Sequence, residues 1–358
     1  MHHSYKIIAD ENMPLVNKLF SASADVQLMP GRDIRRHHLK GVDILLVRSV
    51  TRVDRQLLHD TSVKFVGSAT SGTDHIDIEY LDQNSIAFAY APGCNATAVA
   101  EYSLSAMSSM CKDWPSKKVS VIGCGNVGLT LLSALSSFDV ECNFFDPYVT
   151  RKEFCQLNDI EKIIDSDLIC FHTPLTIGGD FPTENLVDDY MLEALRPGTV
   201  IINAGRGEVV SGKALLNCLK QKKKLRVALD VWEKEPSINL ELLEKIDIGT
   251  PHIAGNTMEG KLRGTWMLHK AFLDWIGCPE MLVPEKNVIR STQVKNNMQI
   301  DSVSDLCLKG YDIGLDNRLL RDSMPTENRN DALVAKIFDG LRKNYRQRHE
   351  YLTPYLQC

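Results

Sequence analysis

The chain has 358 residues with 44% hydrophobic and 24% charged residues and a net charge of −5, which is enough for two or three domains of an ordinary soluble protein. The acidic balance excludes a general affinity for nucleic acid, and no apolar run approaches the length that spans a membrane. Ten cysteines without a C-x-x-C pair fit neither a zinc site nor a disulfide framework. We therefore expect reduced thiols, no metal and a cytoplasmic protein without an export signal.

Short apolar runs alternate with helical patterns over the first hundred residues. The segments YKIIAD, VDILLVRS, VKFVGSAT and IAFAYAP are typical of strands. Strands that alternate with helices predict β-α units and a parallel sheet. We expect such a domain over residues 1–96, and a helix with an apolar face over residues 257–277.

A second set of such units runs over residues 97–256. It starts with KKVSVIGCGNVG and continues through DLICFHTP, GTVIINAGRG, LRVALDVWEKEP and IDIGTPHIAG. This alternation predicts a second parallel α/β domain, of the Rossmann type. Cys278-Pro279 marks a boundary, and the mixed strand and helix signals of residues 281–358 predict a small α+β third domain.

A glycine-rich turn lies at the start of the second domain. VIGCGNVG places Gly123, Gly125 and Gly128 in G-x-G-x-x-G spacing after a predicted strand, and Asp146 follows 18 residues after the last glycine. This context predicts a dinucleotide site. Gly123 permits the tight turn, Gly125 lets the backbone approach the pyrophosphate, and Gly128 allows close packing of helix and strand. Asn126 and Val127 belong to the same turn.

Asp146 also predicts which dinucleotide binds. Its carboxylate, at the end of NFFDP, can accept hydrogen bonds from ribose hydroxyls and would repel the 2′-phosphate of NADP, which favours NAD. Arg151 lies nearby and would weaken that preference. A simple glycine turn with a helix cap at Asp146 is the alternative interpretation.

Three polar residues follow consecutive predicted strands: Arg206, Glu235 and His252. Ligands of open α/β sheets bind outside the carboxyl ends of the strands, so we expect these residues to converge. Arg206 can bind a carboxylate through two hydrogen bonds, and His252 can accept a hydroxyl proton. Glu235 would orient the imidazole and stabilise its protonated form. Taken singly, the three could instead be a turn cation, a loop histidine and a solvated acid.

The motifs VIGCGNVG, INAGRGEVV, ALDVWEKEP and TPHIAG resemble, in order and spacing, those of the D-isomer-specific 2-hydroxyacid dehydrogenases, over residues 5 to about 277. The resemblance implies an NAD-dependent oxidoreductase with Arg206, Glu235 and His252 as the catalytic set. Residues 1–96 and 257–280 would form its flavodoxin-like substrate or lid domain. The resemblance also implies cofactor contacts from Asp146, Thr173, Ala204, Gly205, Asp230 and Gly255.

Further segments resemble one branch of this family, which oxidises 4-phospho-D-erythronate in pyridoxal 5′-phosphate (vitamin B6) biosynthesis. They are ADENMPLVNKLF, LLVRSVTRV, GSATSGTDHID, APGCNATAVAEY and LRKNYRQRHEY. This resemblance implies substrate contacts from Ser49 and Thr70 and a homodimer formed through residues 281–358. Asn256 stands where that branch usually has a tyrosine that contacts the substrate, and its shorter side chain puts this contact in doubt.

A phosphorylated substrate needs a second cation besides Arg206. Arg48, next to Ser49, is the first candidate, and Arg346 or Arg348 is the alternative, although Arg48 could simply pair with an acid. Two other functions stay open. One is a general D-2-hydroxyacid dehydrogenase acting on glycerate or phosphoglycerate. The other is a non-enzymatic NAD-sensing corepressor, against which the lack of a basic tail argues.

Overall fold

The computed structural model describes residues 5–221, 223–289, 300–326 and 330–352. The chain divides into two compact units: the first consists of Met1–Asn95 and Thr257–Val294, and the second of Ala96–Asn256 and Lys295–Cys358. The first unit lies close to the bounds expected for the flavodoxin-like domain. The second unit includes the C-terminal residues that we expected to form a domain of their own, so the division into three domains stays a prediction.

The first unit contains a five-stranded parallel sheet in the order β2-β1-β3-β4-β5. This is the flavodoxin order, as expected. The edge strand β2 was not predicted from the sequence. It pairs only with β1, and just one of its six residues is fully buried. The strands are β1 (Tyr5–Asp10), β2 (Ala24–Met29), β3 (Ile44–Val47), β4 (Phe65–Ser68) and β5 (Ala87–Tyr90).

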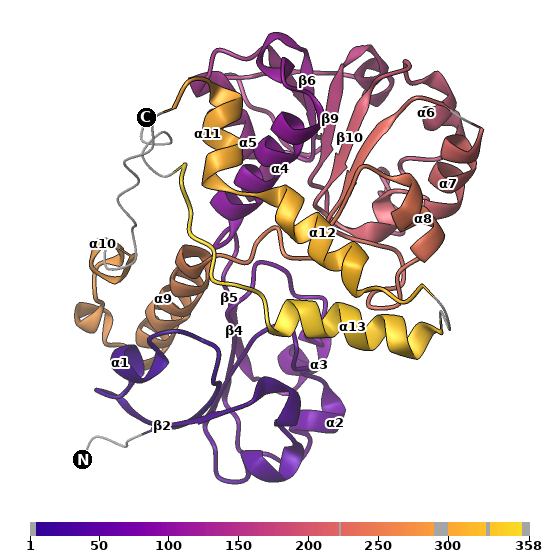
Figure 1. Cartoon of the computed structure of the whole chain (residues 1–358). Helices are drawn as coiled ribbons and strands as arrows, with labels where there is room; N and C mark the ends of the chain where they lie inside the picture. The colour runs from indigo at the N-terminus through magenta and orange to yellow at the C-terminus, as the bar shows by residue number, and fades with distance from the viewer. Residues whose placement is uncertain (1–4, 222, 290–299, 327–329, 353–358) are drawn as a thin grey trace. The chain divides into compact units, whose positions relative to one another are not determined.

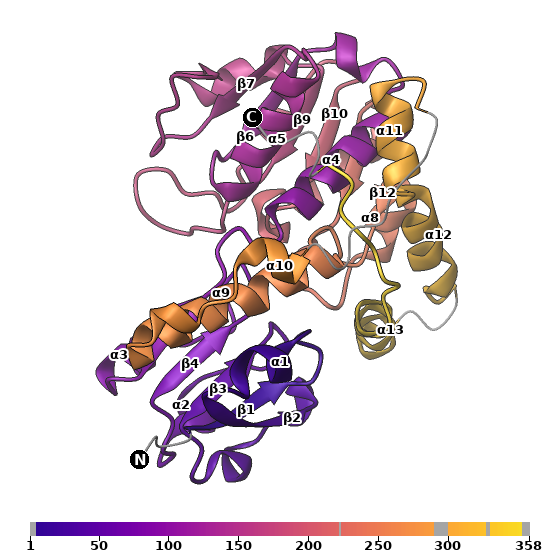
Figure 2. The ribbon, with the colours of Figure 1, turned by 90° about the vertical axis from the view of Figure 1, so that its left-hand side faces the viewer.

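Alternate residues of these strands enter two cores, one on each face of the sheet. Ile7 and Leu46 pack with α1 and α9, whereas Ile8 and Leu45 pack with α2 and α3. The expected helix is present as α9, which lies along β4 and β5 (Figure 2). The helices of this unit are α1 (Val16–Phe20), α2 (Arg55–Leu58), α3 (Ile78–Gln83), α9 (Met258–Ile276) and α10 (Glu285–Ile289).

The second unit contains a seven-stranded parallel sheet in the order β12-β11-β10-β9-β6-β7-β8. Figure 1 labels three neighbouring strands of this sheet, β6, β9 and β10. The order reverses between β6 and β9, as in a Rossmann fold, and this reversal is where such sheets bind nucleotides. The two-residue edge strand β8 was not expected, because both of its residues are exposed. The strands are β6 (Val119–Ile122), β7 (Cys142–Phe145), β8 (Cys155–Gln156), β9 (Leu168–Phe171), β10 (Val200–Asn203), β11 (Arg226–Leu229) and β12 (Ile248–Gly249).

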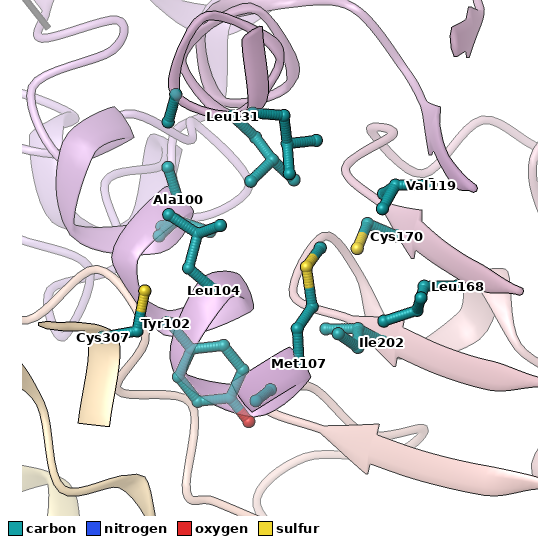
Figure 3. Packing of buried hydrophobic residues seen from close by; sticks show 14 of the residues in the cluster. Ala100, Tyr102, Leu104, Met107, Val119, Leu131, Leu168, Cys170, Ile202 and Cys307 are labelled. Atoms are coloured by element: carbon teal, nitrogen blue, oxygen red, sulfur yellow. The ribbon is translucent and has the colours of Figure 1, made fainter. Parts of the chain in front are cut away.

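Helices cover both faces of this sheet. On one face, Leu104 and Met107 of α4 belong to the same core as Leu168, Cys170 and Ile202 of the strands (Figure 3). On the other face, α6, α7 and α8 pack on the alternate strand residues. No helix within the described ranges is both long and apolar enough to cross a bilayer. The helices here are α4 (Ala96–Met110), α5 (Asn126–Ser137), α6 (Asp189–Ala194), α7 (Gly212–Lys220) and α8 (Leu240–Lys245).

The C-terminal residues were expected to mix strands and helices, and this expectation was wrong for residues 300–326 and 330–352. They form α11 (Val303–Gly310), α12 (Ile313–Ser323) and α13 (Asp331–Lys343), with no strand in those ranges. The apolar residues of α12 and α13, such as Phe338, belong to the same core as residues of α7 and α8. Part of the apolar surface that we expected a second copy to cover is therefore buried within the chain itself.

Candidate active site

The glycine-rich turn joins β6 to α5, at the point where the strand order reverses. Gly123 has a φ of 88°, and a Cβ there would lie 2.9 Å from the amide nitrogen of Thr173. A Cβ at Gly128 would overlap the carbonyl of Gly123, whereas one at Gly125 would meet nothing within 4 Å. The geometry thus gives two glycines packing roles and leaves the backbone at Gly125 open to a ligand. Asn126 and Val127 form the first turn of α5.

Polar groups that can hold a dinucleotide surround this turn. The carboxylate of Asp146, at the end of β7, accepts hydrogen bonds from the amides of Cys124 (2.8 Å) and Tyr148 (2.9 Å). Thr173 follows β9, and its nearly buried hydroxyl has no hydrogen-bond partner among the described residues. A buried polar group in that condition usually has a ligand or water to complete it. These residues therefore fit NAD.

Arg206 lies in a turn after β10 that also contains Ala204 and Gly205. The side chain of Asn203 accepts from the amide of Gly205 (3.1 Å) and donates to the carbonyl of Arg206 (2.8 Å). A Cβ at Gly205 would lie 2.8 Å from the carbonyl oxygen of Thr173, so the turn packs against the loop after β9. Sequence analysis missed Asn203, although an asparagine that begins a turn commonly bonds to the backbone that follows it.

Asp230 ends β11 and organises the loop that carries His252. One carboxylate oxygen accepts from the Thr250 hydroxyl (2.7 Å) and the Ile253 amide (2.8 Å), and the other accepts from the Ala254 amide (2.8 Å). Only 1% of Asp230 is exposed. His252 itself adopts a left-handed φ of 54° and donates its amide to the carbonyl of Asp230 at 2.8 Å.

His252 and Glu235 meet directly. The imidazole Nδ1 lies 2.7 Å from Glu235 Oε2, while the amide of Trp232 donates to Oε1 at 3.0 Å. Burial raises the pKa of Glu235, but the imidazole of His252 and the Trp232 amide outweigh it and hold that pKa below its ordinary value. The imidazole is 37% exposed. Its second nitrogen can therefore meet a ligand while the first is held by a carboxylate.

The turn of Arg206 approaches the segment that leads to Glu235. A Cβ at Gly207 would overlap the backbone of Trp232, so only glycine permits this approach. The loops after β10, β11 and β12 are neighbours because these strands are adjacent in the sheet. The structure thus brings the three expected catalytic residues to one edge of the second unit, with Glu235 and His252 in contact.

Asn256 and Gly255 follow closely after His252. Asn256 donates its amide to the carbonyl of Ile253 at 2.9 Å, which continues the turn. Its side-chain Oδ1 is buried and has no hydrogen-bond partner in the described ranges. Their expected contacts, with the substrate and the cofactor respectively, stay predictions.

Ser49 and Thr70 belong to the first unit. The pairing of Val47 with Ser68 shows that both residues follow adjacent strand ends. The Thr70 hydroxyl lies 2.8 Å from the Gly72 carbonyl and 2.7 Å from the Ser68 hydroxyl. Ser68 in turn lies 2.9 Å from Nε2 of His75, a contact that sequence analysis did not anticipate. The two substrate contacts stay predictions.

Arg48 also lies at this edge of the first unit. Its Nε is 3.3 Å from Oδ2 of Asp10, a fully buried carboxylate at the end of β1. The alternative in which Arg48 pairs with an acid is therefore realised. The side chain of Arg48 is nevertheless 26% exposed, so its guanidinium can also present donors to a ligand.

Arg346 and Arg348, the alternative cations, lie in the second unit. Arg346 lies 3.3 Å from Asp316. Arg348 is almost fully buried, donates to the carbonyls of Ala98 and Ala254, and lies 4.3 Å above the ring of Tyr311. Arg348 is engaged in internal contacts, one of them to the loop of His252, so Arg48 remains the better candidate for a substrate phosphate.

Two family models match the chain. The model described as D-isomer specific 2-hydroxyacid dehydrogenase, NAD binding domain, matches residues 96–254. A domain of unknown function (DUF3410) matches residues 282–358. This second match begins next to the boundary expected at residue 281.

Several relatives are similar over nearly the full length. The erythronate-4-phosphate dehydrogenase of Saccharophagus degradans is 43% identical over 97% of this chain and 93% of its own length. The enzyme of that name from Pectobacterium atrosepticum is 42% identical over 99% of this chain and 94% of its own.

Solved structures share the fold at lower identity. The NAD⁺-bound 3-phosphoglycerate dehydrogenase of Entamoeba histolytica has a TM-score of 0.66 and 22% identity, covering 78% of this chain and 99% of that chain. The D-lactate dehydrogenase of Aquifex aeolicus, complexed with NAD and lactic acid, has a TM-score of 0.65 and 20% identity, covering 77% and 97%.

Replacing Glu235 by Gln tests the electrostatics of the Glu235–His252 pair. Because folding lowers the pKa of Glu235 below its ordinary value of 4.5, the ionised side chain stabilises the fold above that pH. This contribution is lost as the pH falls through the folded value. At neutral pH the melting temperature of the wild type should be higher than that of Glu235→Gln. This difference in melting temperature should disappear in acid.

Glu241→Gln is the matched control, because Glu241 is exposed and pairs with Lys220 on the surface. Such pairs contribute little, so its melting temperature should follow wild type at every pH. A gap for Glu235→Gln that is independent of pH would contradict the assignment.

Proposed function

The chain belongs to the erythronate-4-phosphate dehydrogenases of the D-isomer specific 2-hydroxyacid dehydrogenase family, and we propose that it oxidises 4-phospho-D-erythronate with NAD. The product is (R)-3-hydroxy-2-oxo-4-phosphooxybutanoate, and the pathway is pyridoxal 5′-phosphate (vitamin B6) biosynthesis. The observation that carries the proposal is the 2.7 Å contact between His252 and Glu235 at the sheet edge next to the turn of Arg206.

Three residues of the second unit have separate roles in the reaction. Arg206 binds the carboxylate through charge-assisted hydrogen bonds and fixes the position of the neighbouring carbon. His252 accepts the proton of the 2-hydroxyl at Nε2, because Nδ1 is held by Glu235. The ionised Glu235 stabilises the imidazolium that results. When bound, NAD supplies the hydride acceptor.

The turn that we assign to NAD is that of Gly123–Gly128. The open backbone at Gly125 and the start of α5 favour the pyrophosphate, because backbone amides there point toward an anion. Asp146 favours the free ribose hydroxyls of NAD over the phosphate of NADP. The remaining cofactor contacts proposed are Thr173, Ala204, Gly205, Asp230 and Gly255.

A general D-2-hydroxyacid dehydrogenase acting on glycerate or phosphoglycerate would use the same Arg206, Glu235 and His252. Only the substrate preference separates it from the function proposed. A non-enzymatic corepressor would need the NAD site but no paired acid and base, so the Glu235–His252 contact argues against it.

NAD reduction by the purified chain with 4-phospho-D-erythronate, D-glycerate and 3-phospho-D-glycerate tests the proposal. 4-Phospho-D-erythronate should have the highest kcat/KM. His252→Ala should lower kcat by about 10²–10⁴-fold, which is the usual cost of losing acid–base catalysis. It should leave the affinity for NAD unchanged. His59→Ala, which removes an exposed histidine of the first unit, is the control and should behave as wild type.

Two results would overturn this assignment. A higher kcat/KM for either glycerate substrate would favour the general dehydrogenase. Near-normal turnover by His252→Ala would remove the general base.

We also propose a cytoplasmic homodimer formed through residues 281–358, without nucleic-acid or membrane partners. What supports the dimer is apolar surface that α12 and α13 leave uncovered, with Leu319 44% and Leu333 36% exposed. Leu319 also lines a cavity of about 530 Å³ together with Ile337 and Leu341. Obligate dimers bury such surface against a second copy.

Multi-angle light scattering at micromolar concentration tests the dimer. Wild type should have twice the mass of the chain. Leu319→Glu should shift the mass toward the monomer, because a charge would enter the apolar contact. Lys18→Glu, at an exposed position of the first unit outside residues 281–358, is the control and should stay dimeric. A monomeric wild type would defeat the proposal.

A further inference from the structure

The charge of Arg48 is already balanced within the first unit. Its guanidinium faces the fully buried carboxylate of Asp10 at 3.3 Å. A phosphate beside Arg48 would therefore also face a buried negative charge. Arg48 can donate hydrogen bonds, but its positive charge alone is not sufficient to neutralise a phosphate dianion.

A second cation, Lys261, lies near Arg48. Three residues further along α9, Gly264 packs on Ala69, so closely that an added Cβ would lie 3.1 Å from the Ala69 carbonyl oxygen. Residues three apart lie on the same face of a helix. Lys261 is thus on the face of α9 directed to the end of β4, where Ala69 and Thr70 follow the strand. Arg48 and Ser49 follow the adjacent strand β3.

The ammonium group of Lys261 has no hydrogen-bond or ion-pair partner among the described residues, although the side chain is half-buried. Burial lowers the pKa of Lys261, and the guanidinium of Arg48 lowers it further. The positive charges of Lys261 and Arg48 repel each other, and no acid pairs with Lys261 among the described residues. This repulsion costs free energy, which an anion bound between the two cations would recover.

Asn95, which packs next to the preceding residue of α9, has an unsatisfied polar group. A Cβ at Gly260, the residue before Lys261, would lie 3.5 Å from the Cα of Asn95. The side-chain Oδ1 of Asn95 is buried and lacks a hydrogen-bond partner in the described ranges. An amide side chain can present either its oxygen or its NH₂ group, depending on what it meets. Turned to its NH₂, it would donate to an anion.

We propose that Lys261 and Arg48 form an anion subsite of the first unit that takes the substrate's phosphate monoester, with the amide of Asn95, next to Gly260, as a further donor. Lys261 supplies the positive charge that Asp10 does not cancel and so selects phosphorylated acids. The identity of the substrate rests on the proposed function. The existence of the subsite rests on the residues of the first unit alone.

The ratio of kcat/KM for 4-phospho-D-erythronate to that for D-erythronate tests the subsite. Lys261→Met should lower this ratio about 10- to 100-fold, as expected for the loss of a charge-assisted hydrogen bond. Lys261→Arg should keep most of it, because it keeps the charge. The control is Lys270→Met on the same helix, since Lys270 is exposed and paired with Asp274 at 2.7 Å; it should leave the ratio unchanged.

Binding of inorganic phosphate to the full chain, measured by isothermal titration calorimetry, gives a second readout without turnover. Phosphate should bind wild type and Lys270→Met alike and bind Lys261→Met at least about tenfold more weakly. An unchanged ratio and unchanged phosphate binding in Lys261→Met would overturn the subsite. A wild type that prefers D-erythronate, yet loses phosphate binding in Lys261→Met, would instead refute the proposed substrate and support the subsite. Melting curves of Lys261→Met and Lys261→Arg would show that both variants fold.

Discussion

A single buried carboxylate fixes the geometry on which the candidate active site depends. Asp230 accepts three hydrogen bonds from the loop after β12, and the backbone carbonyl of the same residue accepts the amide of His252. A non-glycine residue with positive φ, as His252 has, is costly unless the surroundings enforce it. The four hydrogen bonds that Asp230 accepts hold the loop, and with it His252, in this conformation. The imidazole is thereby presented to Glu235, whose position is in turn set by the Trp232 amide.

The C-terminal segment supports the same loop from another direction. Arg348 donates to the carbonyl of Ala254, two residues after His252, and to that of Ala98 at the start of α4. Glu101, on the same helix, accepts the amides of Tyr351 and Leu352. Burial raises the pKa of Glu101 to about 8. The C-terminal residues are therefore built into the unit that holds the proposed general base.

Much of the site could be predicted from the sequence because its determinants are local. The roles of Gly123 and Gly128 follow from their spacing, and the positions of Arg206, Glu235 and His252 follow from strand ends. The parallel arrangement of both sheets also follows from the alternation of strands and helices. In each case a short stretch of chain contains both the residue and the reason for it.

The remainder depends on contacts between distant segments, which no single stretch reveals. The acid that faces Arg48 comes from another strand, and the bonds made by Asp230 run to a loop that begins 20 residues later. The C-terminal residues were wrongly expected to mix strands and helices. Their apolar residues pack on a sheet that is distant in the sequence, so the local pattern alone does not reveal the surface that they cover. β2 was missed for the opposite reason, since an edge strand with exposed residues lacks an apolar pattern.

The most direct test of this account is to measure kcat and the dissociation constant of NAD for Asp230→Asn. An asparagine keeps the shape of the side chain, but it cannot accept all three hydrogen bonds and would set its NH₂ group against backbone donors. We predict a loss in kcat at saturating NAD of about 10²-fold or more, approaching that of a general-base deletion, with an intact melting transition. A normal kcat at saturating NAD would contradict the account, because the hydrogen bonds of Asp230 would then not be needed to position His252.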